Sequence, residues 1–267
     1  MNNAVSLSDI HVTLRRKEVL RGISLDVEAG HCIGVVGPNG SGKSTAMRAV
    51  AGLVPVQSGT VSISGRKLRD WPRTDLARHM SYLPQNGEVH WPLRARAVVA
   101  LGRLPHQRSV VDEDAIQDAM VRCDIADLAE RPVNELSGGE RARVLLARAL
   151  ATGGKVILAD EPFAQLDPQH QIHAMEVLKA EAGRGAAVIV VLHDLALAAR
   201  YCDRVVVFSA GTIAAQGLPR DVLSSDILRN VFGVDAFIGE HQGAPLVLPI
   251  RRRSEPGASR GSSPHQG

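Results

Sequence analysis

The sequence lacks an apolar run long enough to cross a membrane. Its longest strongly apolar stretch is AAVIVVL, residues 186–192, whereas a spanning helix needs about 20 such residues. The opening segment, MNNAVSLSDIHV, has neither a basic nor an apolar block, so we expect no secretory signal. We therefore expect a chain without a membrane span of its own.

Cysteines and aromatic residues are also scarce. The three cysteines, Cys32, Cys123 and Cys202, are widely scattered. This odd number predicts neither a disulfide framework nor a metal cluster, so we interpret them as small core residues in a reducing compartment. No Phe, Tyr or Trp precedes Trp71, so the first 70 residues offer no such ring for stacking on a ligand.

Basic and acidic residues are equal in number outside one segment. The chain has 31 Lys and Arg against 28 Asp and Glu. Residues 251–267 hold four Arg and one Glu, so the rest of the chain is balanced. A balanced body gives little electrostatic basis for binding nucleic acid, and we expect no such partner. The segment 251–267 is rich in Gly, Ser and Pro, and we expect it to be a disordered basic tail.

Apolar runs alternate with helical patterns along the rest of the chain, which favours a parallel α/β sheet. The runs expected to be strands are 5–14, 19–27, 31–37, 156–160, 186–192 and 204–209. The segments expected to be helical are one starting at Lys43, 112–128, 140–151 and 168–183, the last with Asp167 as N-cap, Pro168 in its first turn and Gly183 as C-cap. Residues 86–150 carry no strong strand pattern, and we expect a mostly helical insertion there.

A glycine-rich loop predicts a phosphate site. The stretch GPNGSGKST at 37–45 follows a predicted strand and opens a predicted helix. Its glycines let several backbone N–H groups point into one hollow, and the helix N-terminus adds positive potential. Lys43 is expected to reach the β- and γ-phosphates, and the Ser44 hydroxyl to bind Mg²⁺.

Two further segments place polar side chains just after predicted strands. VILADEP at 156–162 ends in the acidic pair Asp160 and Glu161, and His193 follows the apolar run 186–192. Ligands of open α/β sheets bind at the carboxyl ends of the strands. We therefore expect these side chains to share one site with the phosphate loop.

The stretch LSGGERARVLLARAL at 136–150 completes the pattern. Ser137 and Glu140 have the spacing of a capping box, and an amphipathic helix follows. With the phosphate loop, Gln85 in YLPQ, the acidic pair, AQLD at 164–167 and His193 in order, the chain resembles the ATP-binding-cassette (ABC) ATPases. The resemblance implies a P-loop NTPase (RecA-like) core with an N-terminal antiparallel β subdomain and an inserted helical subdomain at about 86–150. The ATPase domain would span 1–250.

The resemblance also implies roles for individual residues. Glu161 would be the general base, His193 would hold the γ-phosphate and the attacking water, and Gln85 would contact the Mg²⁺ shell. Asp160 would support Mg²⁺ together with Ser44 and Gln85. The residues expected to bind ATP from the same chain are Gly37, Pro38, Asn39, Gly40, Ser41, Gly42, Lys43, Ser44, Thr45 and Leu14. Those expected to act across a head-to-tail homodimer are Ser137, Gly138, Gly139 and Asp167.

One segment indicates a subfamily. The ALGRLPH stretch within 89–106 is similar to the ATPase subunits of importers for iron-siderophores, haem and cobalamin. This similarity implies transmembrane permease subunits as partners and, indirectly, an extracytoplasmic substrate-binding protein. It also implies a peripheral position on the cytoplasmic face of the inner membrane. Trp91, Pro92 and Leu93 would offer the permease an apolar surface.

The sequence departs from the family pattern in two places. Phe163 and Gln165 stand where Thr and Ser are usual, and Leu14 stands where an aromatic residue usually stacks on adenine. Two other functions remain open from the sequence alone. One is a soluble ABC ATPase of DNA repair or translation, and the other is the motor subunit of an exporter.

Overall fold

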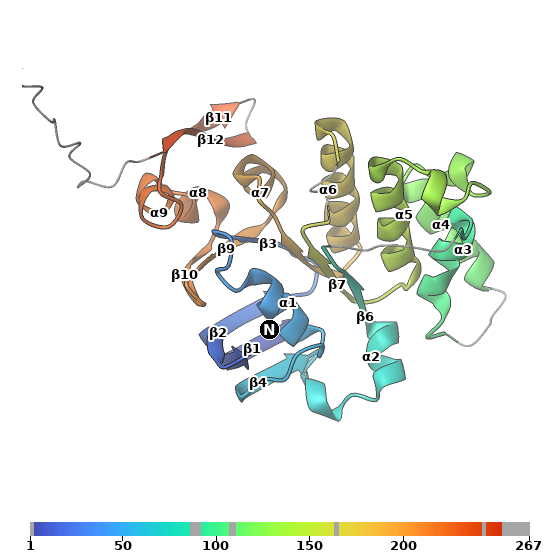
Figure 1. Ribbon diagram of the computed structural model, residues 1–267, viewed down its shortest axis with the longest axis horizontal. Helices are drawn as coiled ribbons and strands as arrows, with labels where there is room; N and C mark the ends of the chain where they lie inside the picture. The colour runs from blue at the N-terminus through green and yellow to red at the C-terminus, as the bar shows by residue number, and fades with distance from the viewer. Residues whose placement is uncertain (1–2, 86–91, 107–110, 163–165, 242–243, 253–267) are drawn as a thin grey trace, which may run out of the picture.

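A six-stranded sheet runs through the middle of the molecule (Figure 1). The computed structural model describes residues 3–85, 92–106, 111–162, 166–241 and 244–252. The strands, in spatial order, are β10 (Thr212–Gly217), β9 (Arg204–Ser209), β3 (Cys32–Val36), β8 (Ala187–Val191), β7 (Val156–Asp160) and β6 (Met80–Leu83). From β9 to β6 all neighbours are parallel, whereas β10 runs antiparallel to β9.

The two faces of this sheet are covered by different layers, because alternate side chains of a strand point to opposite faces. The flanking helices are α1 (Lys43–Val50) on one face, and α6 (Pro168–Gly183) and α7 (Leu195–Tyr201) on the other. Along β3, Ile33 and Val35 pack toward α1, whereas Cys32 and Val36 pack toward α6 and α7. All residues of β3, β7 and β8 are buried, which explains their continuous apolar sequences.

A four-stranded antiparallel sheet packs over α1. Its strands, in spatial order, are β2 (Lys17–Glu28), β1 (Asn3–Leu14), β4 (Ser58–Ile63) and β5 (Arg66–Lys67). The strands expected at 5–14 and 19–27 form its long hairpin. The sequence did not predict β4 or β5, which are short and polar on their exposed positions.

Helices occupy the chain between the neighbouring strands β6 and β7. After α2 (Arg73–His79) and β6, the helical segments are α3 (Ala95–Ala100), α4 (Val111–Arg122), α5 (Gly138–Ala151) and the 3-10 turns Leu101–Arg103, Ala126–Leu128 and Val133–Glu135. The predicted fold class, a P-loop α/β core with an antiparallel β subdomain and a helical insertion, is confirmed.

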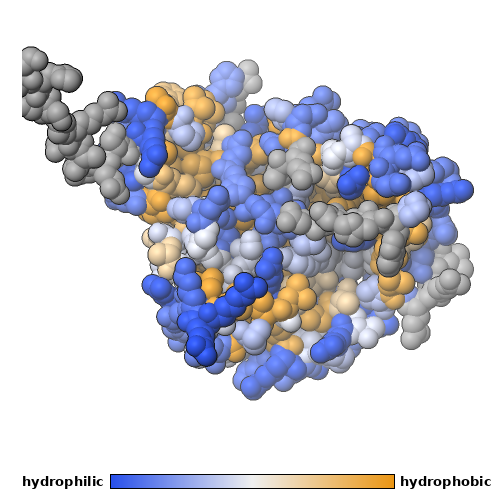
Figure 2. All heavy atoms as spheres, in the orientation of Figure 1, coloured by the Kyte–Doolittle hydropathy of each residue, from blue (hydrophilic) through white to orange (hydrophobic). Residues whose placement is uncertain are grey.

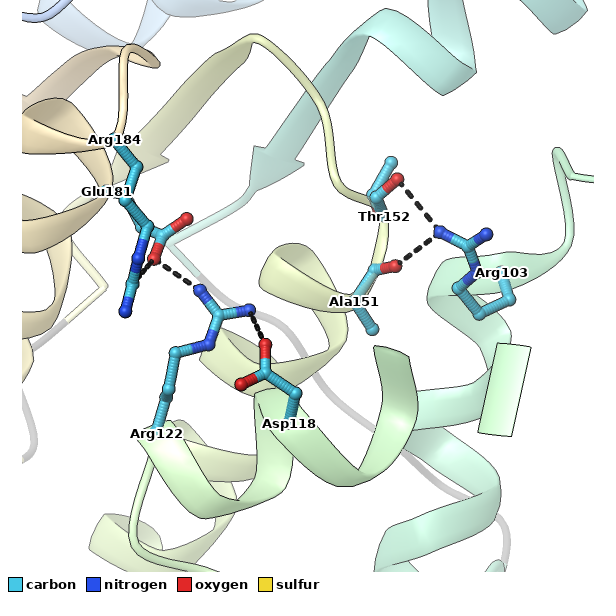
Figure 3. Close-up of polar contacts among 7 residues, drawn as sticks. All are labelled: Arg103, Asp118, Arg122, Ala151, Thr152, Glu181 and Arg184. Carbon is cyan, nitrogen blue, oxygen red and sulfur yellow. Dashed lines mark hydrogen bonds and ion pairs between the residues drawn. The ribbon is translucent and has the colours of Figure 1, made fainter. Parts of the chain in front are cut away.

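An arginine joins the helical insertion to the core (Figure 3). Arg122, at the end of α4, donates to Asp118 at 2.9 Å and also to Glu181 of α6. Glu181 accepts a further bond from Arg184 at 2.5 Å. On the other side of the insertion, Arg103 donates to the carbonyl oxygen of Ala151 at 3.0 Å and so caps the C-terminus of α5.

The C-terminal part consists of α8 (Pro219–Val222), α9 (Ser225–Asn230) and the hairpin of β11 (Val234–His241) with β12 (Ala244–Arg252). The hairpin is anchored by Val247, which is buried against the core. The prediction that disorder begins at residue 251 is wrong for its first two residues. Arg251 and Arg252 belong to β12, and Arg251 Nε donates to Asp235 at 2.9 Å. Residues 253–267 lie outside the described ranges.

Two helix ends differ from the prediction. The helix expected over 112–128 stops at Arg122, because Asp124 adopts a left-handed φ of 52° and the Ile125 N–H bonds back to the Met120 carbonyl. Gly183 is the last helical residue of α6 and not its cap. Gly185, with φ of 100°, takes the left-handed position that ends the helix.

In the described ranges, we find no helix that combines the length and the hydropathy needed to cross a bilayer.

Candidate functional site

The loop after β3 wraps around an open hollow, and a side chain at Gly37 or Gly42 would collide with neighbouring strands. Gly37 has φ of 150°, and a Cβ there would lie 2.3 Å from the Phe208 carbonyl oxygen. Gly42, with φ of 107°, stands directly before α1, and a Cβ there would lie 2.8 Å from Leu20. Any larger residue would push the loop off β9 and β2, so only glycine lets the backbone amides converge.

Lys43 is folded into this loop. It is 5% exposed, and its Nζ donates to the carbonyl oxygens of Gly37 at 2.8 Å and Pro38 at 3.0 Å. Burial lowers the pKa of the Lys43 amine, while the nearby carboxylates of Glu161 and Asp160 oppose that shift. The ammonium therefore lies where an anion in the hollow would meet it.

Asp160, the last residue of β7, is fully buried beside the loop. Its Oδ1 accepts from Ser44 Oγ at 2.9 Å, and its Oδ2 accepts from the Tyr82 hydroxyl at 3.2 Å. Burial raises the pKa of the Asp160 carboxyl, and these two hydrogen bonds oppose the rise. A hydroxyl and a carboxylate are oxygen donors of the kind that Mg²⁺ accepts alongside phosphate oxygens. The residues present therefore fit that ion.

Glu161, the next residue, points toward two partners on neighbouring strand ends. Its Oε2 accepts from Gln85 Nε2 and lies 2.8 Å from His193 Nε2. The Glu161 side chain is 8% exposed, and its backbone has a left-handed φ of 50°. This conformation is uncommon for a non-glycine residue. The turn after β7 therefore directs Asp160 and Glu161 to different partners.

The phosphate loop, Glu161 and its two partners line one cavity of about 350 Å³. It is bounded by Asn39, Gly40, Ser41, Gly42, Lys43, Ser44 and Thr45 of the loop, and by Val19, Gln85, Glu161 and His193. Gln85, Glu161 and His193 follow β6, β7 and β8, so the cavity lies at the carboxyl edge of the parallel sheet. The arrangement can hold a phosphorylated ligand with a carboxylate beside it.

Eight of the predicted residues are not among those that line this cavity: Gly37, Pro38, Leu14, Ser137, Gly138, Gly139, Asp160 and Asp167. Ser137 caps α5, with its side chain accepting from the Glu140 N–H while Glu140 bonds back to the Ser137 N–H. Ser137 and Gly138 are exposed. Asp167 caps α6 by accepting from the His170 N–H at 3.0 Å. Ser137, Gly138, Gly139 and Asp167 lie at helix N-termini apart from the chain's own phosphate loop.

Leu14 also lies outside the cavity lining. It ends β1, is half-buried and packs on the core shared by α1 and the antiparallel sheet. The next two residues, Arg15 and Arg16, form a tight turn with left-handed φ values of 48° and 67°. Val19, just after this turn, contributes instead to the cavity lining. Phe163, Gln165 and Trp91 lie outside the described residues.

A larger cavity of about 1030 Å³ lies between α1, β4 and α2. Figure 2 shows apolar residues gathered in this part of the surface. Leu68, Trp71, Leu76 and Tyr82 contribute to its wall. The larger cavity lacks the glycine loop and the two strand-end carboxylates, so the smaller one is the chemically equipped site.

Sequence reasoning missed two residues at the site, Val19 and Tyr82. Val19 is one of many valines in strands. Tyr82 lies in the four-residue strand β6, and in the YLPQ stretch only Gln85 was predicted to act at the site. Their positions follow from sheet pairing, which the sequence alone does not give.

Comparison with known proteins identifies relatives along most of the chain. The ABC transporter family (ABC_tran) matches residues 20–164. The hemin import ATP-binding protein HmuV of Rhodococcus jostii (strain RHA1) is 46% identical over 247 residues, covering 91% of this chain and 85% of the relative. The cobalamin import ATP-binding protein BtuD of Halobacterium salinarum (strain ATCC 29341 / DSM 671 / R1) is 40% identical, covering 95% of this chain and 65% of the relative.

A solved structure agrees with these sequence relatives. It is a dimeric post-hydrolysis state of an ATP-binding cassette with bound ADP and Pi. It superposes with a TM-score of 0.72 at 26% identity, covering 80% of this chain and 98% of that one.

Proposed function

Because the chain belongs to the ABC transporter family of ATP-binding subunits and is an ATPase, we propose that it drives an importer for hemin by binding and hydrolysing ATP at the cavity described above. One observation carries the proposal. The phosphate loop faces a carboxylate, Glu161, that is held between Gln85 and His193. The import ATP-binding relatives favour this function over DNA repair, translation or export.

Phosphate binding would fall to the loop and to Lys43. The amides of the loop converge on the hollow, and the N-terminus of α1 adds positive potential. The Lys43 ammonium would turn from the carbonyl oxygens of Gly37 and Pro38 to the phosphates. This exchange replaces two neutral acceptors by an anion and strengthens each hydrogen bond.

Ser44, Asp160 and Gln85 would hold Mg²⁺, which when bound neutralises charge on the β- and γ-phosphates. Ser44, which lines the cavity, already hydrogen-bonds Asp160. Gln85 reaches the cavity from the end of β6. The three side chains together offer an hydroxyl, a carboxylate and an amide oxygen.

Glu161 would accept a proton from the attacking water. Its carboxylate faces the cavity, and Gln85 and His193 both contact the same oxygen, Oε2. Oε1 is thereby left to orient toward the water. His193 would also hold the γ-phosphate, since its ring lines the same cavity. A positioned base contributes roughly 10²–10⁴-fold to a rate.

Ser137, Gly138, Gly139 and Asp167 would act on the nucleotide of a second copy in a head-to-tail dimer. Ser137 and Gly138 are exposed at the N-terminus of α5, which suits contact with an anion. The dimeric state of the solved relative supports this arrangement. ATP would then close two copies, and hydrolysis would let them open.

The partner would be a transmembrane permease, with a substrate-binding protein acting outside the membrane. With such a partner the chain would lie at the cytoplasmic face of the inner membrane. The names of the relatives support hemin as cargo, with cobalamin as the second candidate.

Growth on hemin tests the proposal. A bacterial strain that lacks its own hemin import ATPase, and that carries this chain with its permease and binding protein, should grow with hemin as sole iron source. Lys43→Ala should abolish that growth while leaving the protein level unchanged. Rescue of cobalamin uptake alone would move the cargo to cobalamin. Equal growth with wild type and Lys43→Ala would refute an ATP-driven role.

A further inference from the structure

Tyr82 contacts the buried carboxylate of Asp160 through the oxygen that Ser44 does not contact. Its hydroxyl donates to Asp160 Oδ2 at 3.2 Å, while Ser44 donates to Oδ1 at 2.9 Å. The two oxygens of one carboxylate therefore have separate donors, one from β6 and one from α1. Among the residues that the structure describes, these are the side-chain donors recorded at Asp160.

Strand register sets this contact. β6 and β7 are parallel neighbours, and Tyr82 pairs with Leu158, two residues before Asp160. Residues two apart on a strand point to the same face. Leu158 packs on the α1 side of the sheet, and Tyr82 packs there as well. On that face Arg48, four residues after Ser44 on α1, also lies near Tyr82.

The same short strand supplies a donor to each member of the acidic pair. Tyr82 reaches Asp160, and Gln85, just beyond the end of β6, reaches Glu161. Tyr82 is the first residue of the YLPQ stretch, in which only Gln85 was predicted to act at the site. The position of β6 against β7 thus affects both carboxylates at once.

We propose that Tyr82 is a positioning residue for Asp160: it holds Oδ2 so that Oδ1 stays directed at Ser44 and the phosphate loop. This inference rests on the proposed function, in which Ser44 turns its hydroxyl toward Mg²⁺. When Ser44 does so, Tyr82 is the described side-chain donor that remains on Asp160. A fully buried carboxylate without it would lose its orientation.

The test compares Tyr82→Phe with Tyr201→Phe, a control that removes the same atom from the end of α7. The measurement is the affinity for a fluorescent ADP analogue at increasing Mg²⁺ and again in EDTA, so that turnover plays no part. Loss of an outer contact to a metal ligand typically costs 10–100-fold in metal affinity. Tyr82→Phe should therefore raise the Mg²⁺ requirement about tenfold and leave affinity in EDTA unchanged.

Three results would overturn the proposal. One is an unchanged Mg²⁺ requirement in Tyr82→Phe. Another is an equal loss with Mg²⁺ and in EDTA, which a merely structural role would produce. The third is a wild-type chain whose affinity for the analogue does not depend on Mg²⁺, which would refute the assignment of Asp160 and Ser44 to Mg²⁺ binding. A wild-type chain that binds no analogue at all refutes the proposed function instead.

A double-mutant cycle gives an independent check on the pair. In an Asp160→Asn background, Tyr82→Phe should cause no further change in the Mg²⁺ requirement, because the oxygen that it positions is no longer a carboxylate oxygen. An equal effect in both backgrounds would mean that Tyr82 acts through another group.

Discussion

His193 Nε2 lies 2.8 Å from Glu161 Oε2, and the two residues follow adjacent parallel strands, β8 and β7. Gln85, after β6, reaches the same oxygen. Residues that follow β6 and β8 thus hold the carboxylate that follows β7, and both contact the same oxygen. Among the described residues, the hydrogen-bond and ion-pair partners of the Glu161 carboxylate are Gln85 and His193, so its orientation is set before a nucleotide enters.

Removal of the Glu161 charge should separate binding from hydrolysis. Glu161→Gln keeps the shape of the side chain and can still contact His193, but an amide cannot accept the proton of the attacking water. We expect ATP binding to persist while the hydrolysis rate falls roughly 10²–10⁴-fold. ATP binding and phosphate release are measured on the same preparation. Glu176→Gln, exposed on α6, is the control, and normal turnover in Glu161→Gln would exclude Glu161 as the base.

The lack of an aromatic residue at position 14 should weaken selection for adenine. Leu14 offers no π-face, and stacking of a base on an aromatic ring is worth roughly 1–3 kcal/mol. We expect poor discrimination between ATP and GTP, and an increase in ATP affinity of about fivefold, or ~1 kcal/mol, in Leu14→Tyr. Titration of both nucleotides against both proteins measures this. A strong ATP preference in wild type with no gain from tyrosine would show that another residue, such as Val19, contacts the adenine.

The ALGRLPH segment should contribute to permease docking through Leu104. This leucine is 76% exposed, while its neighbour Arg103 is fixed by Asp112 at 2.8 Å. A charge at an apolar contact would lose its hydration on docking. Leu104→Glu should therefore keep ATPase activity but co-purify poorly with the permease. Val121→Glu, at a residue that is 59% exposed on α4, is the matched control, and equal recovery of both variants would place docking elsewhere.

The bridge made by Arg122 should stabilise the fold more than a surface pair does. Arg122 and Glu181 are 19% and 13% exposed, whereas Arg94 and Glu130 are 68% and 69% exposed. A hydrogen bond to a charged group contributes about 1.5–3 kcal/mol when it is shielded, whereas an exposed pair contributes about 0–1 kcal/mol. Denaturant titrations should show a larger loss in unfolding free energy for Arg122→Met than for Arg94→Met. Equal losses would mean that the bridge between α4 and α6 adds nothing.

The buried cysteines should make stability fall at alkaline pH. Burial raises the pKa of the Cys123 thiol from 9.0 to about 12. Above pH 9.0 the unfolded chain releases this proton while the folded chain retains it, so rising pH favours unfolding. The contribution of Cys123 is full below pH 9.0 and is lost as pH rises toward about 12. Urea titrations at several alkaline pH values, compared with Cys123→Ala, should show a weaker dependence in the variant. Identical profiles would contradict this assignment.

Much of the fold could be predicted because its central strands are buried on both faces. β3, β7 and β8 have no polar face, and such sequences have few other stable environments. β4 and β6 are short, and half-exposed residues interrupt them. They become strands only because β1 and β7 offer edges for pairing. The sequences of β4 and β6 do not by themselves indicate those partner strands.

The same distinction between local pattern and strand pairing applies to the residues of the site. The glycines of the loop and Glu161 were predicted because their chemistry depends on local spacing. Val19 reaches the site from the β1–β2 hairpin, and Tyr82 reaches it through a parallel pair with the distant strand β7. Leu14 was assigned by its place in a pattern; it is half-buried at the end of β1 and lies outside the residues that line the cavity, so its contact with adenine stays a prediction.

The order of strands in the central sheet has a consequence for synthesis. β3 precedes the phosphate loop in the chain, but its hydrogen-bonded neighbours are β8 and β9, which are among the later strands to be made. Until residue 191 has left the ribosome, β3 has no native partner on either edge, and its second edge stays unpaired until β9 is complete at residue 209. Unpaired apolar strands aggregate readily, and non-local parallel pairing is slow. We therefore expect fragments that end before β9 to depend on chaperones, and nucleotide binding to arise late, when the sheet closes around β3.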